Sequence, residues 1–161
     1  MKIIGIDPGT ARVGWALIES QNVKLHPVYG CISTDQTLPP EIRLLKIQQE
    51  LKQIIDKFHP ECMSLEDLFF ATNAKTAIAV GQARGVILLT AAIYNLPVIS
   101  YTPLAVKLTI CGDGKADKDQ VAKMVKLNLN ENNIPGPDDI TDALAIALTH
   151  AYSYKLKGKL L

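Results

Sequence analysis

Runs of apolar residues predict three β-strands at the start of the chain, over residues 2–7, 12–19 and 23–33. The connections between these runs are short, as in an antiparallel meander. Asp7 stands at the end of the first run, directly before the Pro-Gly pair of a turn. A carboxylate at the end of a buried strand is costly unless it is solvated, paired or bound to a cation. Asp7 is therefore the first candidate for a functional residue.

The rest of the chain alternates between helical and strand patterns. Apolar residues recur at helical spacing from Glu41 to Phe58, and a second helix is expected over about 73–95. Short apolar runs predict one strand that ends near Glu66 and another over 97–101. Three further helices are expected to begin at Thr102, at Asp117 with Gln120 in a capping box, and at Asp138. The order βββαβαβααα predicts an α/β fold in which helices flank a mixed five-stranded sheet, the pattern of a ribonuclease-H-like core.

Length and composition indicate one globular domain over residues 1–161. The chain is 48% apolar and 20% charged, which is typical of folded rather than disordered proteins. No stretch approaches the roughly 18–20 apolar residues of a membrane helix, and no signal-peptide pattern is visible. A cytoplasmic protein without membrane contact is expected. Three widely spaced cysteines indicate reduced thiols rather than disulfides or a zinc site: Cys31, Cys62 and Cys111.

Three more acids join Asp7 as candidates. Glu66 also ends an apolar strand, and Asp139 and Asp142 lie three residues apart on one face of a helix rich in alanine. Helix capping explains Asp138 or Asp139, but not Asp142, which lies one turn further on. If the strands of Asp7 and Glu66 are neighbours, their ends lie about 5 Å apart. A buried helix packed across this end of the sheet then brings all four carboxylates together.

A cluster of four carboxylates points to hard divalent cations. Ionised carboxylates within a few ångströms repel one another unless protons or cations intervene. Mg²⁺ prefers oxygen ligands, uses few carboxylates and keeps waters and substrate phosphates. Two such ions about 3.5–4 Å apart form a phosphodiester-cleaving site, in which one activates water and the other stabilises the leaving 3′ oxygen. This chemistry needs no nucleophilic side chain, and the sequence shows no Ser-His-Asp or Cys-His arrangement.

The net charge of +1 neither indicates nor excludes nucleic acid as a partner. Lysines gather in residues 107–126 and 155–159, and a solvated face is the usual explanation of such runs. Lys115, in a Gly-rich loop, is a candidate contact for a DNA backbone, and binding by several lysines would weaken steeply with salt. Small residues along 77–91 allow either close packing on the sheet or self-association of the helix.

Four stretches of the sequence together resemble the RuvC family of Holliday-junction resolvases. They are, in chain order, GIDPGT with VGWALIE, LEDLFFATNAKTAIAVGQARG, VKLTICGDGKADKDQV, and DDITDALAIALTH. The four motifs stand in the family's order and spacing and extend over almost the whole chain, so the resemblance is specific.

The resemblance implies a ribonuclease-H-like homodimer that makes symmetrical, Mg²⁺- or Mn²⁺-dependent nicks in four-way DNA junctions during recombination and repair. It also implies cooperation with the RuvA–RuvB branch-migration complex, and by analogy the helix over 77–91 is the candidate seam of the dimer. The family's catalytic, metal-binding acids fall on Asp7, Glu66, Asp139 and Asp142. Its aromatic residue at the junction centre falls on Phe69, and its two basic residues near the scissile strand fall on Lys107 and Lys118, with Lys118 counted among the catalytic residues.

Two neighbouring acids are interpreted differently from the four. Asp138 directly precedes Asp139, but the three-residue spacing to Asp142 favours Asp139 as the ligand. Asp67 directly follows Glu66, and strand alternation should turn its side chain to the opposite face of the sheet, at the surface.

Other functions are alternatives to a junction resolvase. Sugar kinases and actin-like ATPases use a turn similar to GIDPGT, but they need a duplicated core for which 161 residues leave no room. A related ribonuclease-H-like nuclease acting on RNA is a second alternative. A non-catalytic, junction-binding scaffold is a third, although such a protein is expected to have lost at least one of the four acids.

Overall fold

The computed structural model describes residues 1–20, 27–67 and 74–157. Within them the predicted order of elements is confirmed: β1 (Lys2–Asp7), β2 (Arg12–Glu19), β3 (Val28–Ser33), α1 (Pro40–Phe58), β4 (Cys62–Glu66), α2 (Ala74–Ile93), β5 (Val98–Tyr101), α3 (Pro103–Cys111), α4 (Lys118–Leu129) and α5 (Asp138–Lys157). The third strand begins later than predicted, at Val28, and residues 23–26 of the predicted strand lie outside the described residues. None of the helices in the described ranges is long and apolar enough to cross a membrane.

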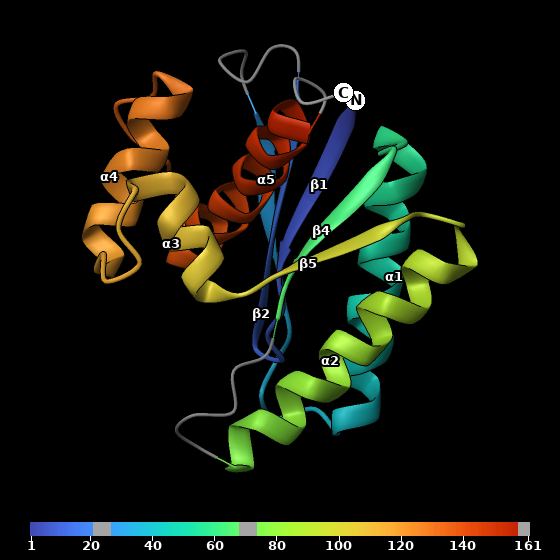
Figure 1. Ribbon diagram of the computed structural model, residues 1–161. Coiled ribbons are helices and arrows are strands. Elements are labelled where there is room, and N and C mark those ends of the chain that lie inside the picture. Colours follow the sequence, from blue (N-terminus) through green and yellow to red (C-terminus); the bar gives the residue numbers. More distant parts are fainter. Residues whose placement is uncertain (21–26, 68–73, 158–161) are drawn as a thin grey trace.

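The five strands form one mixed sheet in the order β3-β2-β1-β4-β5. β1 pairs with β2 and β2 with β3 in antiparallel register, which confirms the predicted meander. β4 lies parallel to both β1 and β5. Helices α1 and α2 cover one face of the sheet, and α3, α4 and α5 cover the other (Figure 1). The predicted α/β fold class is confirmed.

Alternation along β1 divides the core between the two faces. Ile4 and Ile6 pack with α1 and α2, whereas Ile3 packs with the helices of the opposite face. Asp7 continues the second series, so its side chain belongs to the face that α5 covers. The same alternation places Ser64 on the α5 face, where its hydroxyl donates a hydrogen bond to the Ile146 carbonyl at 2.8 Å.

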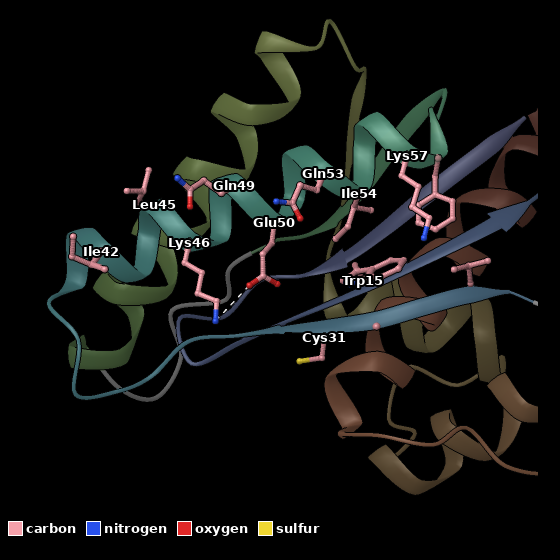
Figure 2. A pocket seen from close by; sticks show the side chains of 13 residues that line it. Trp15, Cys31, Ile42, Leu45, Lys46, Gln49, Glu50, Gln53, Ile54 and Lys57 are labelled. Atoms are coloured by element: carbon pink, nitrogen blue, oxygen red, sulfur yellow. Dashed lines mark ion pairs between the residues drawn. The ribbon is translucent and has the colours of Figure 1, made fainter.

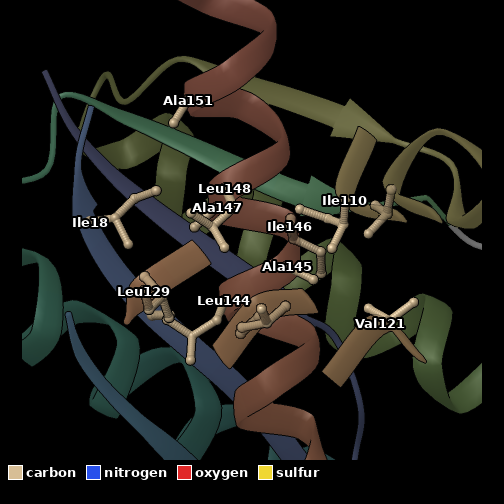
Figure 3. Packing of buried hydrophobic residues seen from close by; sticks show 14 of the residues in the cluster. Ile18, Ile110, Val121, Leu129, Leu144, Ala145, Ile146, Ala147, Leu148 and Ala151 are labelled. Carbon is tan, nitrogen blue, oxygen red and sulfur yellow. The ribbon is translucent and has the colours of Figure 1, made fainter. Parts of the chain in front are cut away.

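Helix α5 is the buried helix of the molecule. Every residue from Ala143 to Leu148 is buried, and these side chains meet residues of β2, α3 and α4 (Figure 3). Two strand glycines let the helix approach the sheet closely: a Cβ at Gly5 would collide with the carbonyl of Ala143, and one at Gly14 with the carbonyl of Asp139. The path of α5 across the sheet is therefore fixed partly by the absence of two side chains.

Local hydrogen bonds fix the start of α4. The Asp117 carboxylate accepts the Gln120 N–H at 2.8 Å, and the Gln120 side-chain oxygen accepts the Asp117 N–H at 2.8 Å. The predicted capping box is thus confirmed, and it makes Lys118 the first residue of the helix. Thr102 caps α3 by a single hydrogen bond, in which its hydroxyl accepts the Ala105 N–H at 3.2 Å. The three cysteines are free thiols, as predicted.

Candidate active site

The ends of two neighbouring strands bring Asp7 and Glu66 together. Ile6 of β1 pairs with Leu65 of β4 in parallel register, and the two acids are the next residues of their strands. Because both follow the same alternation, both side chains lie on the face that α5 covers. The two side chains interact: Asp7 forms a hydrogen bond with Glu66, and the charge of Glu66 contributes to the raised pKa of Asp7.

The first turns of α5 supply the other two acids. In the sheet, Asp7 pairs with Gly14 of β2, and the backbone of Asp139 lies directly on Gly14. Asp142 follows one turn later, and its charge acts on both Asp7 and Glu66. The convergence predicted from the sequence is therefore present in the fold, with α5 lying across the ends of β1 and β4.

The two strand acids are difficult to ionise in this arrangement. Burial, followed by repulsion from Glu66, Asp142 and Asp139, raises the pKa of Asp7 to about 8. Burial and repulsion from Asp142 raise the pKa of Glu66 to about 7, although a hydrogen bond with Asp7 and the charge of Lys118 oppose the rise. At neutral pH, without a cation, Asp7 is therefore mostly protonated and Glu66 is about half protonated.

Lys118 supplies one positive charge to the site. Its ammonium group lies 2.6 Å from a carboxylate oxygen of Asp138 and 3.0 Å from one of Asp142. These contacts raise the pKa of Lys118 above its usual value. Burial raises the pKa of Asp142, and the contact with Lys118 partly offsets that rise. Asp138 is exposed, so it belongs to the rim of the site rather than to its buried part.

Arg12 is a second base at the site, and the sequence had not indicated it. Its guanidinium Nε lies 3.3 Å from Oδ2 of Asp139. That oxygen is buried and has no hydrogen-bond partner among the described residues. Among the described residues this oxygen thus has an ion-pair contact with Arg12 but no hydrogen bond, which is unusual for a buried oxygen.

The residues at this site fit a hard divalent cation by their chemistry. In the described ranges no group of three or more His, Cys, Asp or Glu side chains is arranged to hold a metal ion as it stands, and two of the four acids face Lys118 and Arg12 instead. The donors are nevertheless all carboxylate oxygens, the type that Mg²⁺ prefers. One of these oxygens lacks a hydrogen bond among the described residues. Burial, and then repulsion between the acids, raises the pKa values of Asp7 and Glu66, and a divalent cation would offset the repulsion.

A pocket of about 210 Å³ opens beside the acids. Its charged residues are Glu66, Asp142, Lys107 and Lys118, and its floor is apolar, formed by Val106, Val121, Ala145 and Ile146 with Pro103. The two lysines predicted to lie near the scissile strand thus line one pocket. A phosphate at this opening would meet positive charge from two helices and carboxylates from β4 and α5.

A larger cavity lies away from the acids. It has a volume of about 880 Å³ and lies between α1 and the edge strand β3, with Trp15, Ile42 and Phe58 among its lining residues (Figure 2). All the residues that line it fall within 15–58, and none of the four acids is among them. Size therefore does not identify the site that carries the chemistry.

The remaining predicted residues are placed as follows. Lys115 is exposed on the loop between α3 and α4, its backbone N–H bonds to the Asp113 side chain, and it does not line the pocket beside the acids. Phe69 lies outside the described residues. Asp67 points to the face opposite the four acids, as predicted, where its carboxylate pairs with Arg84 of α2 at 2.7 Å.

Two residues at the site, Gly14 and Arg12, carried a signal that the sequence interpretation did not use. An isolated glycine within a strand, such as Gly14, indicates a close backbone approach, and its pairing with Asp7 follows from the predicted hairpin. Arg12 begins the strand next to the Asp7 strand, which already places it near the same end of the sheet. Arg84 is different, because its contact with Asp67 depends on how α2 packs and not on local spacing.

Comparison with known proteins gives one consistent result. The family model described as "Crossover junction endodeoxyribonuclease RuvC" matches residues 3–150. The chain is 51% identical to a protein of that description from Halothermothrix orenii over 160 residues, covering 99% of this chain and 97% of the relative. It is 49% identical to one from Desulforamulus reducens over 152 residues, covering 94% and 93%.

Solved structures agree with the sequence relatives. The structure of RuvC from Thermus thermophilus in complex with a Holliday junction substrate superposes with a TM-score of 0.90 at 33% identity, covering 98% of this chain and 96% of the other. The Holliday junction resolvase of fowlpox virus, at 16% identity and a TM-score of 0.56, shares the fold.

Proposed function

The chain belongs to the RuvC family of crossover junction endodeoxyribonucleases, and from this membership we propose that it resolves four-way DNA junctions by metal-dependent hydrolysis of phosphodiester bonds. One observation carries the chemical part of the proposal. Partly buried carboxylates from β1, β4 and α5 converge so closely that burial and their mutual repulsion raise the pKa of Asp7 to about 8. Such repulsion is sustained in a fold when the site is used to bind cations.

The four acids are proposed to hold the metal. Asp7, Glu66, Asp139 and Asp142 would bind two Mg²⁺ ions per site, with Mn²⁺ as a substitute. Ions bound there would supply an activated water and stabilise the leaving 3′ oxygen. Within the acids, Asp139 is assigned as a ligand rather than Asp138, because the Asp139 oxygen is buried and lacks a hydrogen bond, whereas Asp138 is exposed and paired with Lys118.

Basic residues are proposed to place the scissile phosphate. Lys107 and Lys118 line the opening beside Glu66 and Asp142, so a phosphate there would be held within reach of the acids. Lys118 is the candidate catalytic residue that would neutralise the charge of the phosphate, since its ammonium group already lies 3.0 Å from Asp142. Lys115, further out on its loop, is proposed to contact the DNA backbone, and Phe69 to stack on an unpaired base at the crossover.

A homodimer would present two such sites to the two opposed strands of a junction. Helix α2 supports this proposal, because it exposes an apolar stripe at helical spacing: Ile78, Leu89 and Ile93 are 68%, 59% and 62% exposed. Gly85 lies on the same stripe, and apart from its chain neighbours and the backbone of its own helix, no atom of the described residues lies within 4 Å of the position that its Cβ would occupy. The proposed assembly also includes the RuvA–RuvB branch-migration complex.

The whole chain is proposed to act as one nuclease domain over residues 1–161. The two hydrophobic clusters lie on opposite faces of one sheet, and this arrangement supports a single unit in the described residues. A cytoplasmic location is part of the same proposal, since the substrate is chromosomal DNA.

A substrate panel tests the proposed function. The protein is incubated with Mg²⁺ and a four-way DNA junction with a mobile core, a linear duplex of the same sequence, and an RNA duplex. The expected result is paired nicks at symmetrical positions in opposed strands of the junction, with little cutting of either duplex and none after addition of EDTA.

Two other outcomes would overturn the proposal in different ways. Tight junction binding without cutting in Mg²⁺ or Mn²⁺, across several core sequences, would indicate a non-catalytic scaffold. Preferential cutting of RNA would indicate the related nuclease class.

A further inference from the structure

Arg84 of α2 reaches the end of β4 from the face of the sheet opposite the four acids. Its Nη2 donates to the Asp67 carboxylate at 2.7 Å and to the Ser100 hydroxyl at 2.9 Å, and its Nε donates to the backbone carbonyl of Glu66 at 3.3 Å. The side chain is only 20% exposed. One guanidinium therefore joins α2, the end of β4 and the neighbouring strand β5.

We propose that Arg84 is a positioning residue for Glu66, and that it sets the affinity of the acid cluster for divalent cations by holding the end of β4 in place. This inference rests on the metal-dependent function proposed above. Arg84 bonds the backbone carbonyl of Glu66 and the side chain of Asp67, so its effect on the metal would pass through the position of this strand end and through the charge of Asp67.

The geometry explains why this strand end needs a support. Glu66 is the last residue of β4, and the Asp67 N–H bonds to the Tyr101 carbonyl of β5 at 2.9 Å. Leu65 and Ser100 are paired in parallel register, so the Ser100 hydroxyl lies on the α2 face, within reach of Arg84. A planar guanidinium binds a carboxylate, a hydroxyl and a carbonyl through donors that are fixed on separate nitrogens, whereas the three donors of a lysine share one nitrogen at the end of a flexible chain.

Charge adds to the same effect. Asp67 lies one residue from Glu66, and its charge is one of the influences on that carboxyl. Arg84 neutralises Asp67 with a charge-assisted hydrogen bond on the far face of the sheet. Loss of Arg84 would thus release the backbone that orients Glu66. It would also leave the charge of Asp67 uncompensated beside the four acids. Outer residues that orient ligands in this manner commonly change metal affinity by about 10–100-fold.

The experiment measures metal binding by the full chain without DNA. Mn²⁺ is titrated into wild type, Arg84→Ala and Arg84→Lys, and free Mn²⁺ is followed by electron paramagnetic resonance. We expect Arg84→Ala to bind Mn²⁺ roughly tenfold more weakly. Arg84→Lys, which keeps the charge beside Asp67 but lacks the fork of donors, should fall between the two.

Cleavage provides a second readout that a general loss of folding would not reproduce. The Mg²⁺ concentration for half-maximal junction cleavage should rise by about the same factor in Arg84→Ala, while the rate at saturating Mg²⁺ returns to within about threefold of wild type. Junction affinity in EDTA should stay within about twofold.

Arg43→Ala is the matched control, because Arg43 is also a helix arginine whose guanidinium bonds a hydroxyl, that of Thr34, at 2.9 Å. It should leave Mn²⁺ affinity unchanged. Mn²⁺ affinity and Mg²⁺ dependence of both Arg84 variants within twofold of wild type, whatever happens to their melting temperature, would overturn the inference. A wild-type protein that cuts no junction, yet loses Mn²⁺ affinity on Arg84→Ala, would overturn the proposed function and leave this inference standing.

Discussion

Asp7 is the acid of the site whose pKa is raised most clearly, to about 8. It is partly buried beside three other carboxylates, and among the described residues Lys118 and Arg12 form ion pairs with two of these, Asp142 and Asp139. A buried acid of this kind destabilises the fold when it ionises, because the unfolded chain solvates the carboxylate freely. The same property makes the site a strong ligand for a cation, since the bound ion removes the repulsion.

The stability of the metal-free protein should therefore depend on pH through Asp7 and Glu66. Their folded pKa values, about 8 and about 7, lie above the ordinary values of 3.8 and 4.5. The two protonated carboxyls therefore contribute to the free energy of unfolding in full below about pH 4, and this contribution is lost as the pH rises to 8. In EDTA, Asp7→Asn should match wild type at pH 4.5 and exceed its unfolding free energy by about 2–4 kcal/mol at pH 9.

Urea unfolding at several pH values measures this difference, and saturating Mg²⁺ should reduce it at pH 9. The exposed acid Asp119 offers a control, since Asp119→Asn should shift stability little at any pH. A difference between Asp7→Asn and wild type that does not change from pH 4.5 to pH 9 would show that Asp7 is not the buried acid described here.

The two adjacent aspartates at the start of α5 should behave differently. Asp139→Asn removes a buried oxygen assigned to the metal and should slow single-turnover junction cleavage by at least about 100-fold. Asp138→Asn removes one exposed ion pair with Lys118, an interaction worth about 1 kcal/mol or less, so the rate should change by less than about fivefold. Equal losses in the two variants, or a larger loss in Asp138→Asn, would contradict the assignment.

At the scale of elements, the site depends on how closely α5 packs on the sheet. Gly5 and Gly14 leave room for the helix backbone, and Gly14 lies beneath Asp139 and beside Asp7. Ser64 of β4 adds a hydrogen bond to the same helix. The acids are therefore positioned by backbone contact between elements, and a small displacement of α5 moves two of the four together.

Gly14→Ala tests this packing. The added methyl group meets the Asp139 backbone, which cannot move aside as a flexible side chain would, so α5 must shift away from the sheet. We expect a loss of about 1–3 kcal/mol in unfolding free energy. Displacement of two acids should slow cleavage by about 100-fold. Wild-type stability and rate in Gly14→Ala would show that the close approach is unimportant.

The elements themselves were predictable because their signals are local. Apolar spacing indicated the order of strands and helices, and the residues of the α4 capping box lie three apart in the sequence. The convergence of Asp7 and Glu66 followed from two strand ends once the strands were taken as neighbours.

Two ion pairs that depend on packing between distant elements were not predicted. The pairing of Arg84 with Asp67 requires α2 to lie against the end of β4, and the Arg12–Asp139 contact requires α5 to cross β2. No periodicity in the sequence encodes either distance. The expected role of Phe69 came from the family resemblance and falls outside the described residues.

At the scale of the whole molecule, charge is arranged for a polyanion although the net charge is only +1. Lys107 and Lys118 line the pocket beside the acids, and Lys115 is exposed on the nearby loop. Two bound divalent cations would add four positive charges to each chain, and a dimer would double the total. Affinity for DNA should then come mainly from phosphate contacts near the site, not from the overall charge.

Salt dependence measures these contacts. The logarithm of junction affinity should fall linearly with the logarithm of salt concentration, and Lys107→Ala and Lys115→Ala should each reduce the slope by about 1. Lys52→Ala, on the far helix α1 and paired with Asp56 at 2.6 Å, should leave it unchanged. An unaltered slope in both Lys107→Ala and Lys115→Ala would show that these lysines do not contact phosphate.

The most direct measurement follows binding and cutting of one labelled four-way junction by wild type and Asp7→Asn, in Mg²⁺ and in EDTA. Wild type should make paired symmetrical nicks only in Mg²⁺. Asp7→Asn should bind the junction as tightly as wild type, cut it at least about 100-fold more slowly in Mg²⁺, and make no nicks in EDTA. Undiminished cutting by Asp7→Asn, or cutting by wild type in EDTA, would contradict a metal site built on this carboxylate.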